Sequence, residues 1–481
     1  MIPTKIVATV GPASESADVL GRMLEAGVHV LRLNMSHGKQ AQHQRVVETA
    51  RRVAADRGLH VALLADLCGP KVRTNEIDPQ SAAIKPGDRC EIVRDAGRGT
   101  AARFGTNYDK FIDEVNAGHR VLIDDGSIRL RVRERRPDRL LCECEMGGVI
   151  GTRKGLNVPD SSLSISAITP KDEDDLKWAI GQGVDFVALS FVRRADDVQA
   201  LRRTIRKLGA DTPIVSKVET PQAIDDIDAI VQASDAILVA RGDLGVEMNV
   251  TQVPFLQKDI VWRCRRAGKP VIIATQMLHS MIERSTPTRA EVSDVANAAL
   301  EGADAVMLSG ESATGANPVE SVAMMNRICE EAYAFTSRKG QRRADVVDER
   351  LRVGHESDPT SSAVARSAAM VALDLQAKLV AVWCRSGRTA RWISKYQIRR
   401  PLVALAAQDR MCRRMALSYG LDPLLVSGEL MSGAAPWEEL EAMLAAKYGL
   451  EAGDVIVEVG DPRARERGSS IAIHLVGMCP A

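Results

Sequence analysis

The pattern of hydrophobic and polar positions divides most of the first 335 residues into short apolar runs that alternate with amphipathic stretches. The runs are rich in Val, Ile, Leu and Ala, which is typical of strands buried on both faces. Between them, apolar residues recur at helical spacing, with Thr169-Pro170 as a start signal and Gly209, Gly268 and Gly302 as stop signals. The predicted strands are Thr4–Val10, Val28–Asn34, Val61–Asp66, Phe186–Phe191, Ile214–Glu219, Ala236–Asp243, Val271–Thr275 and Ala305–Ser309.

Buried strands that alternate with helices predict a parallel sheet, and eight such units predict a closed (β/α)8 TIM barrel of the α/β class. The carboxyl ends of its strands share one rim, so polar residues there are candidates for chemistry. The predicted helices are Ser16–Ala26, Gln40–Arg57, Lys171–Gly181, Asp196–Leu208, Gln222–Gln232, Gln252–Ala267 and Thr288–Leu300.

The alternation breaks between residues 74 and 160, where short segments with a period of two are separated by Gly, Pro and Asp. The stretch Val121–Val132 alternates most strictly and predicts antiparallel hairpins. We therefore expect a small β-barrel domain inserted after the third strand. Its two connections to the barrel would let it move as a lid.

A second change of pattern follows Phe335, where the basic, polar stretch Ser337–Arg352 predicts a linker helix. From Pro359 onward strands and helices alternate again, which predicts a separate open α/β domain. The expected organisation is a barrel of residues 1–73 and 161–335, a lid of residues 74–160 and a C-terminal regulatory domain of residues 336–481.

Composition narrows the range of partners. The 64 Lys and Arg residues nearly cancel the 63 Asp and Glu residues, so no overall field favours nucleic acid or a membrane surface. Aromatic residues are only 3%, too few for base-stacking platforms. No apolar run reaches the length of a membrane span, and the nine Cys are scattered, with only Cys142 and Cys144 close together. We expect a soluble cytoplasmic protein with reduced thiols, without nucleic-acid or membrane partners.

Two loops at predicted strand ends carry candidate phosphate and cation ligands. In the first, Arg32 and Asn34 alternate onto one face of the strand, and Ser36 and His37 follow. An Arg side chain suits phosphate because its fork makes two charge-assisted hydrogen bonds, although an ordinary surface loop would look similar. The second loop runs from Asp66 to Thr74; its Asp66 can hold a cation and its Arg73 a phosphate, or it can be a charged turn that enters the insertion.

The strongest candidates follow two neighbouring strands. Glu219 and Asp243 can together supply two oxygen ligands for Mg²⁺, which takes one or two carboxylates and completes its shell with substrate and water. Lys217 lies on the same face as Glu219, and the backbone N–H groups of Gly242 and Asp243 can bind a carboxylate. An internal salt bridge of Lys217 with either acid is the structural alternative.

The next strand end offers the hydroxyl group of Thr275. Asp294 and Asn297 follow on an early turn of the predicted helix, and there helix capping is the favoured interpretation.

Read in order and spacing, these segments resemble the pyruvate kinase family. The resemblance is carried by the strings TKIVATVGP, RLNMSHG, LADLCGPKVRT, SKVET, VARGDLGVE, AGKPVIIATQML, PTRAEVSDVANA and GADAVMLSGESATGANPVE. It covers the whole barrel, is looser in the insertion through VLIDDGSIRL and RKGLNVPD, and is looser again in the C-terminal string CRSGRTARWISKYQIRRPLVAL.

The resemblance implies Mg²⁺-dependent transfer of a phosphoryl group from phosphoenolpyruvate to ADP, giving pyruvate and ATP in the last step of glycolysis. It places Mg²⁺, for which Mn²⁺ can substitute, on Glu219 and Asp243. Lys217, Arg32 and Arg73 would surround the phosphoryl group, and Thr275, Gly242 and Asp243 would orient the carboxylate. The nucleotide is expected at Asn34, His37 and Arg73, with Ser309 as a support residue, and Asp125 moves with the lid.

Two residues depart from the family pattern. Lys71 stands where many members have Glu, close to a K⁺ site that the family builds from residues matching Asn34, Ser36 and Asp66. A tethered ammonium group can replace that ion, as in the K⁺-independent branch, so we expect no K⁺ requirement. The alternative is that Lys71 is a solvated surface charge. The second departure is His279 in place of the usual Glu, which we interpret as a support or interface residue.

The C-terminal loop Ser386-Gly387-Arg388-Thr389 precedes a predicted helix, whose N-terminus favours phosphate. By resemblance it is a candidate effector site for a phosphorylated sugar or a nucleotide, with added charge from Pro462–Ser469, although a simple strand–helix turn fits equally well. Family members are usually homotetramers. The alternatives to a kinase are a Mg²⁺-dependent barrel lyase or aldolase acting on an enolate and a non-catalytic metabolite sensor. A sensor is expected to lose Lys217, Glu219, Asp243 or Thr275, and all four are present.

Overall fold

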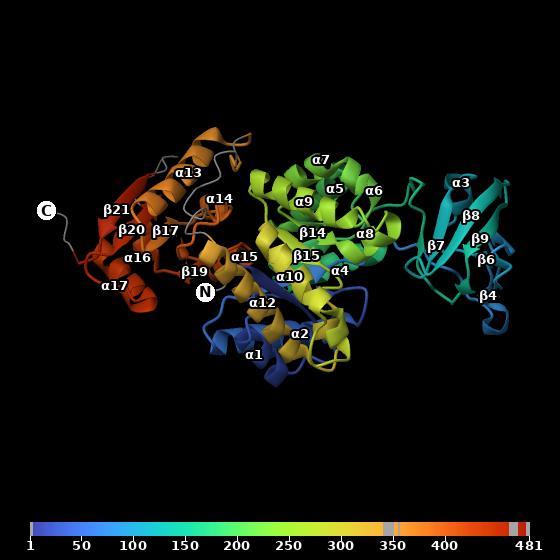
Figure 1. Cartoon of the computed structure of the whole chain (residues 1–481), viewed down its shortest axis with the longest axis horizontal. Helices are drawn as coiled ribbons and strands as arrows, with labels where there is room; N and C mark the ends of the chain where they lie inside the picture. Colours follow the sequence, from blue (N-terminus) through green and yellow to red (C-terminus); the bar gives the residue numbers. More distant parts are fainter. Residues whose placement is uncertain (1–2, 340–350, 355, 461–469, 478–481) are drawn as a thin grey trace.

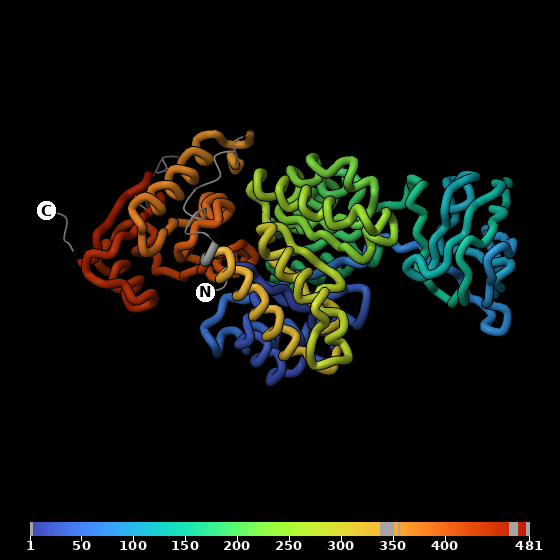
Figure 2. The backbone as a smooth tube through the Cα atoms, viewed as in Figure 1, coloured from blue at the N-terminus to red at the C-terminus, as the bar shows by residue number. Residues whose placement is uncertain are grey.

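The computed structural model describes residues 3–339, 351–354, 356–460 and 470–477. Three bodies follow one another along the long axis of the molecule, with the barrel between the C-terminal domain and the inserted domain (Figure 1). Figure 2 shows that the chain leaves the barrel for the inserted domain and returns from it through adjacent segments. No helix in these described ranges is both long enough and apolar enough to cross a membrane.

The predicted TIM barrel is confirmed. All of its strands are parallel, and they close in the order β1-β16-β15-β14-β13-β12-β3-β2. The register places Asn34 beside Asp66 and Lys217 beside Leu238, so side chains from successive strands reach the same rim. The strands are β1 (Lys5–Val10), β2 (Val30–Asn34), β3 (Ala62–Asp66), β12 (Phe186–Leu189), β13 (Ile214–Val218), β14 (Ala236–Ala240), β15 (Val271–Ala274) and β16 (Ala305–Leu308).

Helices surround this sheet and begin and end where the capping residues predict. Thr169 forms a capping box with Asp172, and Gly268 and Gly302 end their helices with φ of 69° and 91°. The helices are α1 (Ala17–Glu25), α2 (Gln40–Asp56), α4 (Pro170–Gly181), α5 (Ala195–Lys207), α6 (Pro221–Asp225), α7 (Ile227–Ala233), α8 (Arg241–Glu247), α9 (Val253–Ala267), η2 (His279–Ile282), α10 (Arg289–Glu301), α11 (Gly310–Ala313) and α12 (Pro318–Lys339).

Two expectations for these elements were wrong. The single helix predicted over Gln222–Gln232 is two helices, because Asp226 ends α6 and leads directly into α7. The strand predicted to run to Asp243 ends at Ala240, and Asp243 lies in the first turn of α8. The helix follows Ala240 without a connecting loop, so the sequence pattern offers no turn signal that separates the end of the strand from the start of the helix.

The inserted domain is built from β-hairpins, as predicted, but it is not a closed barrel. It contains a six-stranded sheet in the order β11-β7-β8-β9-β5-β6 and a two-stranded sheet of β10 and β4. Cys90 and Cys142 face each other across β5 and β9 as free thiols in its core. The elements are η1 (Pro79–Ser81), β4 (Ala83–Ile84), β5 (Arg89–Val93), β6 (Arg103–Gly105), α3 (Phe111–Glu114), β7 (Arg120–Ile123), β8 (Ile128–Arg135), β9 (Arg139–Met146), β10 (Gly148–Val149) and β11 (Leu156–Asn157).

The C-terminal domain is the expected open α/β sheet, in the order β19-β18-β17-β20-β21, with only β21 antiparallel. Of the predicted linker helix, α12 reaches Lys339 and residues 340–350 lie outside the described part of the chain. The elements are α13 (Pro359–Asp374), β17 (Leu379–Trp383), α14 (Arg388–Ser394), β18 (Leu402–Ala406), α15 (Asp409–Met415), β19 (Leu421–Leu425), α16 (Gly428–Ser432), α17 (Trp437–Tyr448), β20 (Val455–Val459) and β21 (Ile471–Leu475).

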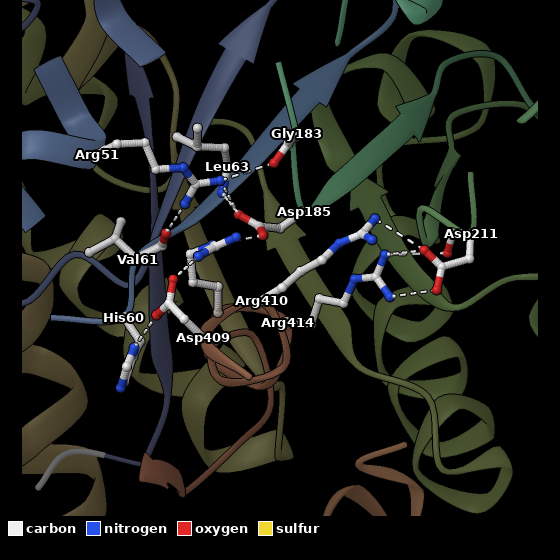
Figure 3. Close-up of polar contacts among 11 residues, drawn as sticks. Arg51, His60, Val61, Leu63, Gly183, Asp185, Asp211, Asp409, Arg410 and Arg414 are labelled. Atoms are coloured by element: carbon white, nitrogen blue, oxygen red, sulfur yellow. Dashed lines mark hydrogen bonds and ion pairs between the residues drawn. The ribbon is translucent and has the colours of Figure 1, made fainter. Parts of the chain in front are cut away.

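Buried carboxylates join the C-terminal domain to the amino ends of the barrel strands. Asp185, just before β12, accepts hydrogen bonds from the Leu63 N–H at 2.9 Å, Arg51 at 2.7 Å and Arg413 of α15 at 2.9 Å. Asp304, just before β16, accepts one from Lys395 at 2.5 Å. Figure 3 shows the Asp185 contacts beside a second, exposed contact in which Arg410 and Arg414 of α15 hold Asp211.

A hydrophobic contact completes this joint. Leu417 of the C-terminal domain belongs to the cluster of side chains that fills the interior of the barrel, with Val7, Leu238 and Ile272 among its members. The C-terminal domain therefore closes the amino end of the barrel, and the opposite rim is left for chemistry.

Asp185→Asn should lower the free energy of unfolding by about 3 kcal/mol, because it removes the fully buried carboxylate that Arg51 and Arg413 share and leaves Arg413 with Asp409 alone. The matched change Asp211→Asn removes an Asp whose side chain is 72% exposed and should cost less than about 1 kcal/mol. Urea denaturation of both variants measures the difference, and equal losses would contradict this ranking.

Candidate active site

A compact charged cluster occupies the carboxyl ends of β2, β3, β12 and β13. The Lys217 ammonium lies 2.9 Å from Glu219 and 3.5 Å from Asp66, and it donates a hydrogen bond to Ser190 at 2.8 Å. Arg32 donates to the other oxygen of Asp66 at 2.7 Å and to the Thr9 hydroxyl at 2.9 Å. The structure thus brings together Arg32, Asp66, Lys217 and Glu219, which the sequence placed at separate strand ends.

Burial makes these charges depend strongly on one another. It disfavours the ammonium of Lys217, but the carboxylates of Asp66 and Glu219 prevail and raise the Lys217 pKa above its usual range. Burial also opposes ionisation of Asp66, but Lys217 and Arg32 lower its pKa below the usual value. Burial raises the pKa of Glu219, against the attraction of Lys217. Lys217 therefore stays a cation across the physiological pH range.

The second part of the site is the start of α8 and the strained turn beside it. The Gly242 N–H donates to the Thr275 hydroxyl at 2.7 Å, and that hydroxyl donates to the Ala274 carbonyl at 2.6 Å. Thr275 has φ of 70°, which is costly for a β-branched residue and is typical of functional sites. The first helical turn presents Gly242 and Asp243 to the rim that holds Glu219.

Arg241 holds this turn in place. It donates to the carbonyl oxygen of Thr275 at 2.8 Å and pairs with Asp294 at 2.6 Å. The prediction that Asp294 caps a helix was therefore wrong. Thr288 is the N-cap of α10, and Asp294 lies in its second turn, where its carboxylate faces Arg241.

The structure adds a residue that sequence reasoning missed. Glu247, at the end of α8, is buried and accepts a hydrogen bond from the Asn157 side chain at 2.6 Å. Burial, with the nearby charges of Asp243 and Glu219, raises its pKa to about 7. The spacing of four residues from Asp243 was the available signal, because it places both carboxylates on one face of a helix.

Other predicted residues lie apart from the cluster. Arg73 donates to the Arg153 carbonyl at 2.9 Å, and Lys71 pairs with Asp125 at 3.6 Å, so both face the inserted domain. Asn34 accepts a hydrogen bond from the Ser36 N–H at 3.1 Å. Ser36 and His37 are exposed on the loop after β2.

The remaining candidates lie at the periphery. The Ser309 N–H donates to Glu311 at 2.8 Å, and His279 is exposed at the start of η2. In the C-terminal loop, Gly387 has φ of 71° and precedes α14, while Arg388 pairs with Asp358 at 3.6 Å. Ser386 and Thr389 flank these two residues, with Ser386 exposed. The predicted contribution of Pro462–Ser469 lies outside the described residues.

The donor set fits a hard divalent cation. Glu219 and Asp243 offer carboxylate oxygens, and in the described ranges no cluster of three or more His, Cys, Asp or Glu residues forms a complete metal cage. Mg²⁺ suits such a site because it binds through one or two carboxylates and keeps its other positions for substrate and water. Beside it, Lys217 and Arg32 can neutralise an anion in a largely buried setting.

A closed (β/α)8 barrel with a charged cluster at its carboxyl rim defines a barrel enzyme. The family model described as pyruvate kinase, barrel domain, matches residues 1–322, and the model described as pyruvate kinase, alpha/beta domain, matches residues 362–474. The chain belongs to the pyruvate kinase family and is a phosphotransferase enzyme.

Individual relatives match nearly the whole of this chain. A pyruvate kinase from Sporosarcina psychrophila is 38% identical over 99% of this chain and 81% of its own. One from Clostridium acetobutylicum is 36% identical over 96% of this chain and 97% of its own. The crystal structure of a pyruvate kinase from Cryptosporidium parvum superposes with a TM-score of 0.88 at 32% identity, over 98% of this chain and 96% of that one.

Glu247→Gln should stabilise the metal-free protein, and by more at pH 7.5 than at pH 4.5. The folded-state pKa of Glu247 is raised to about 7, so the wild-type folded state binds more protons than the unfolded state between about pH 4.5 and 7. Its stability therefore falls as pH rises through that window, by an amount on the order of 2–3 kcal/mol, whereas Gln does not titrate. Urea denaturation with EDTA at both pH values measures the difference, and a pH-independent gap would contradict it.

Proposed function

We propose that this enzyme transfers the phosphoryl group of phosphoenolpyruvate to ADP, giving pyruvate and ATP, with Mg²⁺ bound by Glu219 and Asp243. The observation that supports it most directly is Lys217 in a buried contact with Glu219 and Asp66, with Arg32 on the far side of Asp66. Phosphoryl transfer depends on positioning and charge neutralisation, and this cluster offers both.

Each residue then has a role that follows from its place. Arg32 and Lys217 bind the transferring phosphoryl group, and Arg73 joins them from the segment that enters the lid. The hydroxyl of Thr275 and the N–H groups of Gly242 and Asp243 orient the substrate carboxylate. When bound, Mg²⁺ (or Mn²⁺) supplies Lewis-acid stabilisation of the oxygens that gain charge. Lys217 stabilises the enolate oxygen, and Thr275 passes a proton to the enolate through water.

We propose that ADP binds on the side of the loop after β2, where Asn34 and the exposed His37 lie, with Arg73 within reach and Ser309 as a support residue. The inserted domain, with Asp125, acts as the lid that excludes water, which would otherwise take the phosphoryl group. These assignments retain the division into a barrel of residues 1–73 and 161–335, a lid of residues 74–160 and a C-terminal domain of residues 336–481.

The cytoplasm is the proposed compartment, and a homotetramer the proposed assembly. Phe255 and Trp262, seven residues apart on α9, are exposed on one face of that helix and suit a contact between subunits. The loop Ser386–Thr389 is the proposed site for a phosphorylated sugar or nucleotide effector, because Gly387 is the N-cap of α14 and Arg388 is exposed.

Lys217→Met should lower kcat for ADP-dependent pyruvate formation by about 10³-fold, because it removes a cation that acts on the transition state in a buried site. Lys447→Met is the matched control, since Lys447 pairs with Asp422 in the C-terminal domain. A coupled pyruvate assay with Mg²⁺ measures both. A Lys217 variant that keeps kcat within tenfold of wild type would overturn the assignment.

K⁺ should not be required, because the ammonium of Lys71 stands in for it beside Asn34, Ser36 and Asp66. In this structure Lys71 pairs with Asp125 of the lid. To take the place of K⁺, Lys71 turns from Asp125 towards the rim in another position of the lid. Lys71→Glu should make turnover depend on K⁺, measured in tetramethylammonium buffer with and without KCl. Strong K⁺ stimulation of wild type, or a variant with unchanged dependence, would contradict the role of Lys71.

A further inference from the structure

The lid is tied to the barrel by a buried hydrogen bond that reaches the metal-binding helix. Asn157, in the returning strand β11, donates from its side-chain amide to Glu247 at 2.6 Å. Glu247 is only 8% exposed, so water competes poorly for this carboxylate. Figure 1 shows α8 on the side of the barrel that faces the lid, with β7 opposite it.

The two ends of α8 serve different neighbours. Its first turn carries Gly242 and Asp243 at the site, and its last residue is Glu247. Asp243 and Glu247 are four residues apart and share one helix face. The lid turn at Gly126 lies against Val246, since a β-carbon there would sit 3.5 Å from the Val246 side chain. Because α8 is only seven residues long, a displacement of Glu247 can be passed along the helix to Asp243.

The rest of the connection is a two-stranded ribbon, whose returning segment is also held to the barrel by Gln222, which donates to the Ser161 carbonyl at 3.2 Å. The Thr74 N–H donates to the Lys154 carbonyl at 2.9 Å, and the Leu156 N–H donates to the Val72 carbonyl at 2.8 Å. A two-stranded ribbon twists and bends easily on its own. The side-chain bond from Asn157 to α8 therefore restrains the direction in which the lid stands over the site.

The charges around Glu247 favour the orientation in which its carboxylate accepts this bond. Asp243 and Glu219 repel it and Arg120 of β7 attracts it, while Asp160 holds Arg120 at 2.7 Å. The attraction comes from the lid and the repulsion from the barrel site. Both the attraction and the repulsion favour a Glu247 side chain that faces the lid.

We propose that Glu247 is a positioning residue for phosphoryl transfer. Through its hydrogen bond with Asn157, Glu247 couples the orientation of the lid to the position of Asp243. The proposal rests on the proposed function for its catalytic part. When the bond is intact, the lid covers the rim and α8 holds Asp243 at Glu219. When it is broken, the lid samples wider positions and water reaches the phosphoryl group.

Glu247→Ala should lower kcat for ADP-dependent transfer about tenfold, leave KM for phosphoenolpyruvate within threefold, and raise the fraction of phosphoenolpyruvate hydrolysed without ATP formation. Asn157→Ala should do the same, and the double variant should be no worse than either single one. Glu247→Gln keeps an acceptor for Asn157 and should stay within threefold of wild type. Glu145→Ala, which removes a lid-surface pair with Arg131, is the matched control and should change none of these values.

Hydrogen exchange on the unliganded proteins separates this proposal from the proposed function. Glu247→Ala and Asn157→Ala should speed amide exchange in residues 72–75 and 154–157 at least fivefold, and Glu247→Gln should not. Unchanged exchange, or independent and additive losses of kcat, would overturn the coupling. Absence of ADP-dependent turnover in wild type would refute the proposed function, while the exchange result would still decide whether the bond restrains the lid. If Glu247→Ala fails to fold, Asn157→Ala decides alone.

Discussion

The buried ammonium of Lys217 between Asp66 and Glu219 is the interaction on which the rest of this site depends. Each of these charges would be costly alone in a buried position; the neighbours hold Lys217 and Asp66 ionised, while burial raises the pKa of Glu219. Arg32 and Ser190 complete the hydrogen bonds of Asp66 and Lys217. Its two cations are matched by two carboxylates, and Asp243 adds a third negative charge, so a divalent cation bound by the acids would leave the site net positive for an anion.

The two ends of the barrel have different neighbours. At the amino ends, Asp185 and Asp304 bind cations from the C-terminal domain, and Leu417 fills the interior. At the carboxyl ends, the barrel strands present the proposed catalytic residues. Strand β12 joins Asp185 to Ser190 through only four residues. One short, fully buried strand therefore links the contact with the C-terminal domain to the site at the opposite rim.

The inserted domain is joined to the barrel by a two-stranded ribbon, by the hydrogen bond from Asn157 to Glu247 of α8, and by Gln222 and Arg193 on the returning segment. This difference in attachment agrees with the proposed role of the inserted domain as a lid and with a fixed joint to the C-terminal domain. Glu247 lies where the movable and fixed parts meet. Its buried carboxylate, placed near two other acids, is costly in the folded state, which is the usual mark of a residue retained for function and not for stability.

How much the sequence determined is clearest from particular residues. Apolar runs and capping signals were enough for the barrel, the hairpin insertion and the open C-terminal sheet, because period and turn chemistry are local properties. Strand-end position alone also selected Arg32, Asp66, Lys217, Glu219 and Thr275, since parallel strands bring their ends to one rim. Only the tertiary structure decided that Asp243 lies in a helix, that Asp294 faces Arg241, and that Lys71 and Arg73 turn to the lid. It alone revealed Glu247, because a hydrogen bond between residues 90 positions apart depends on how two domains pack, which no local pattern encodes.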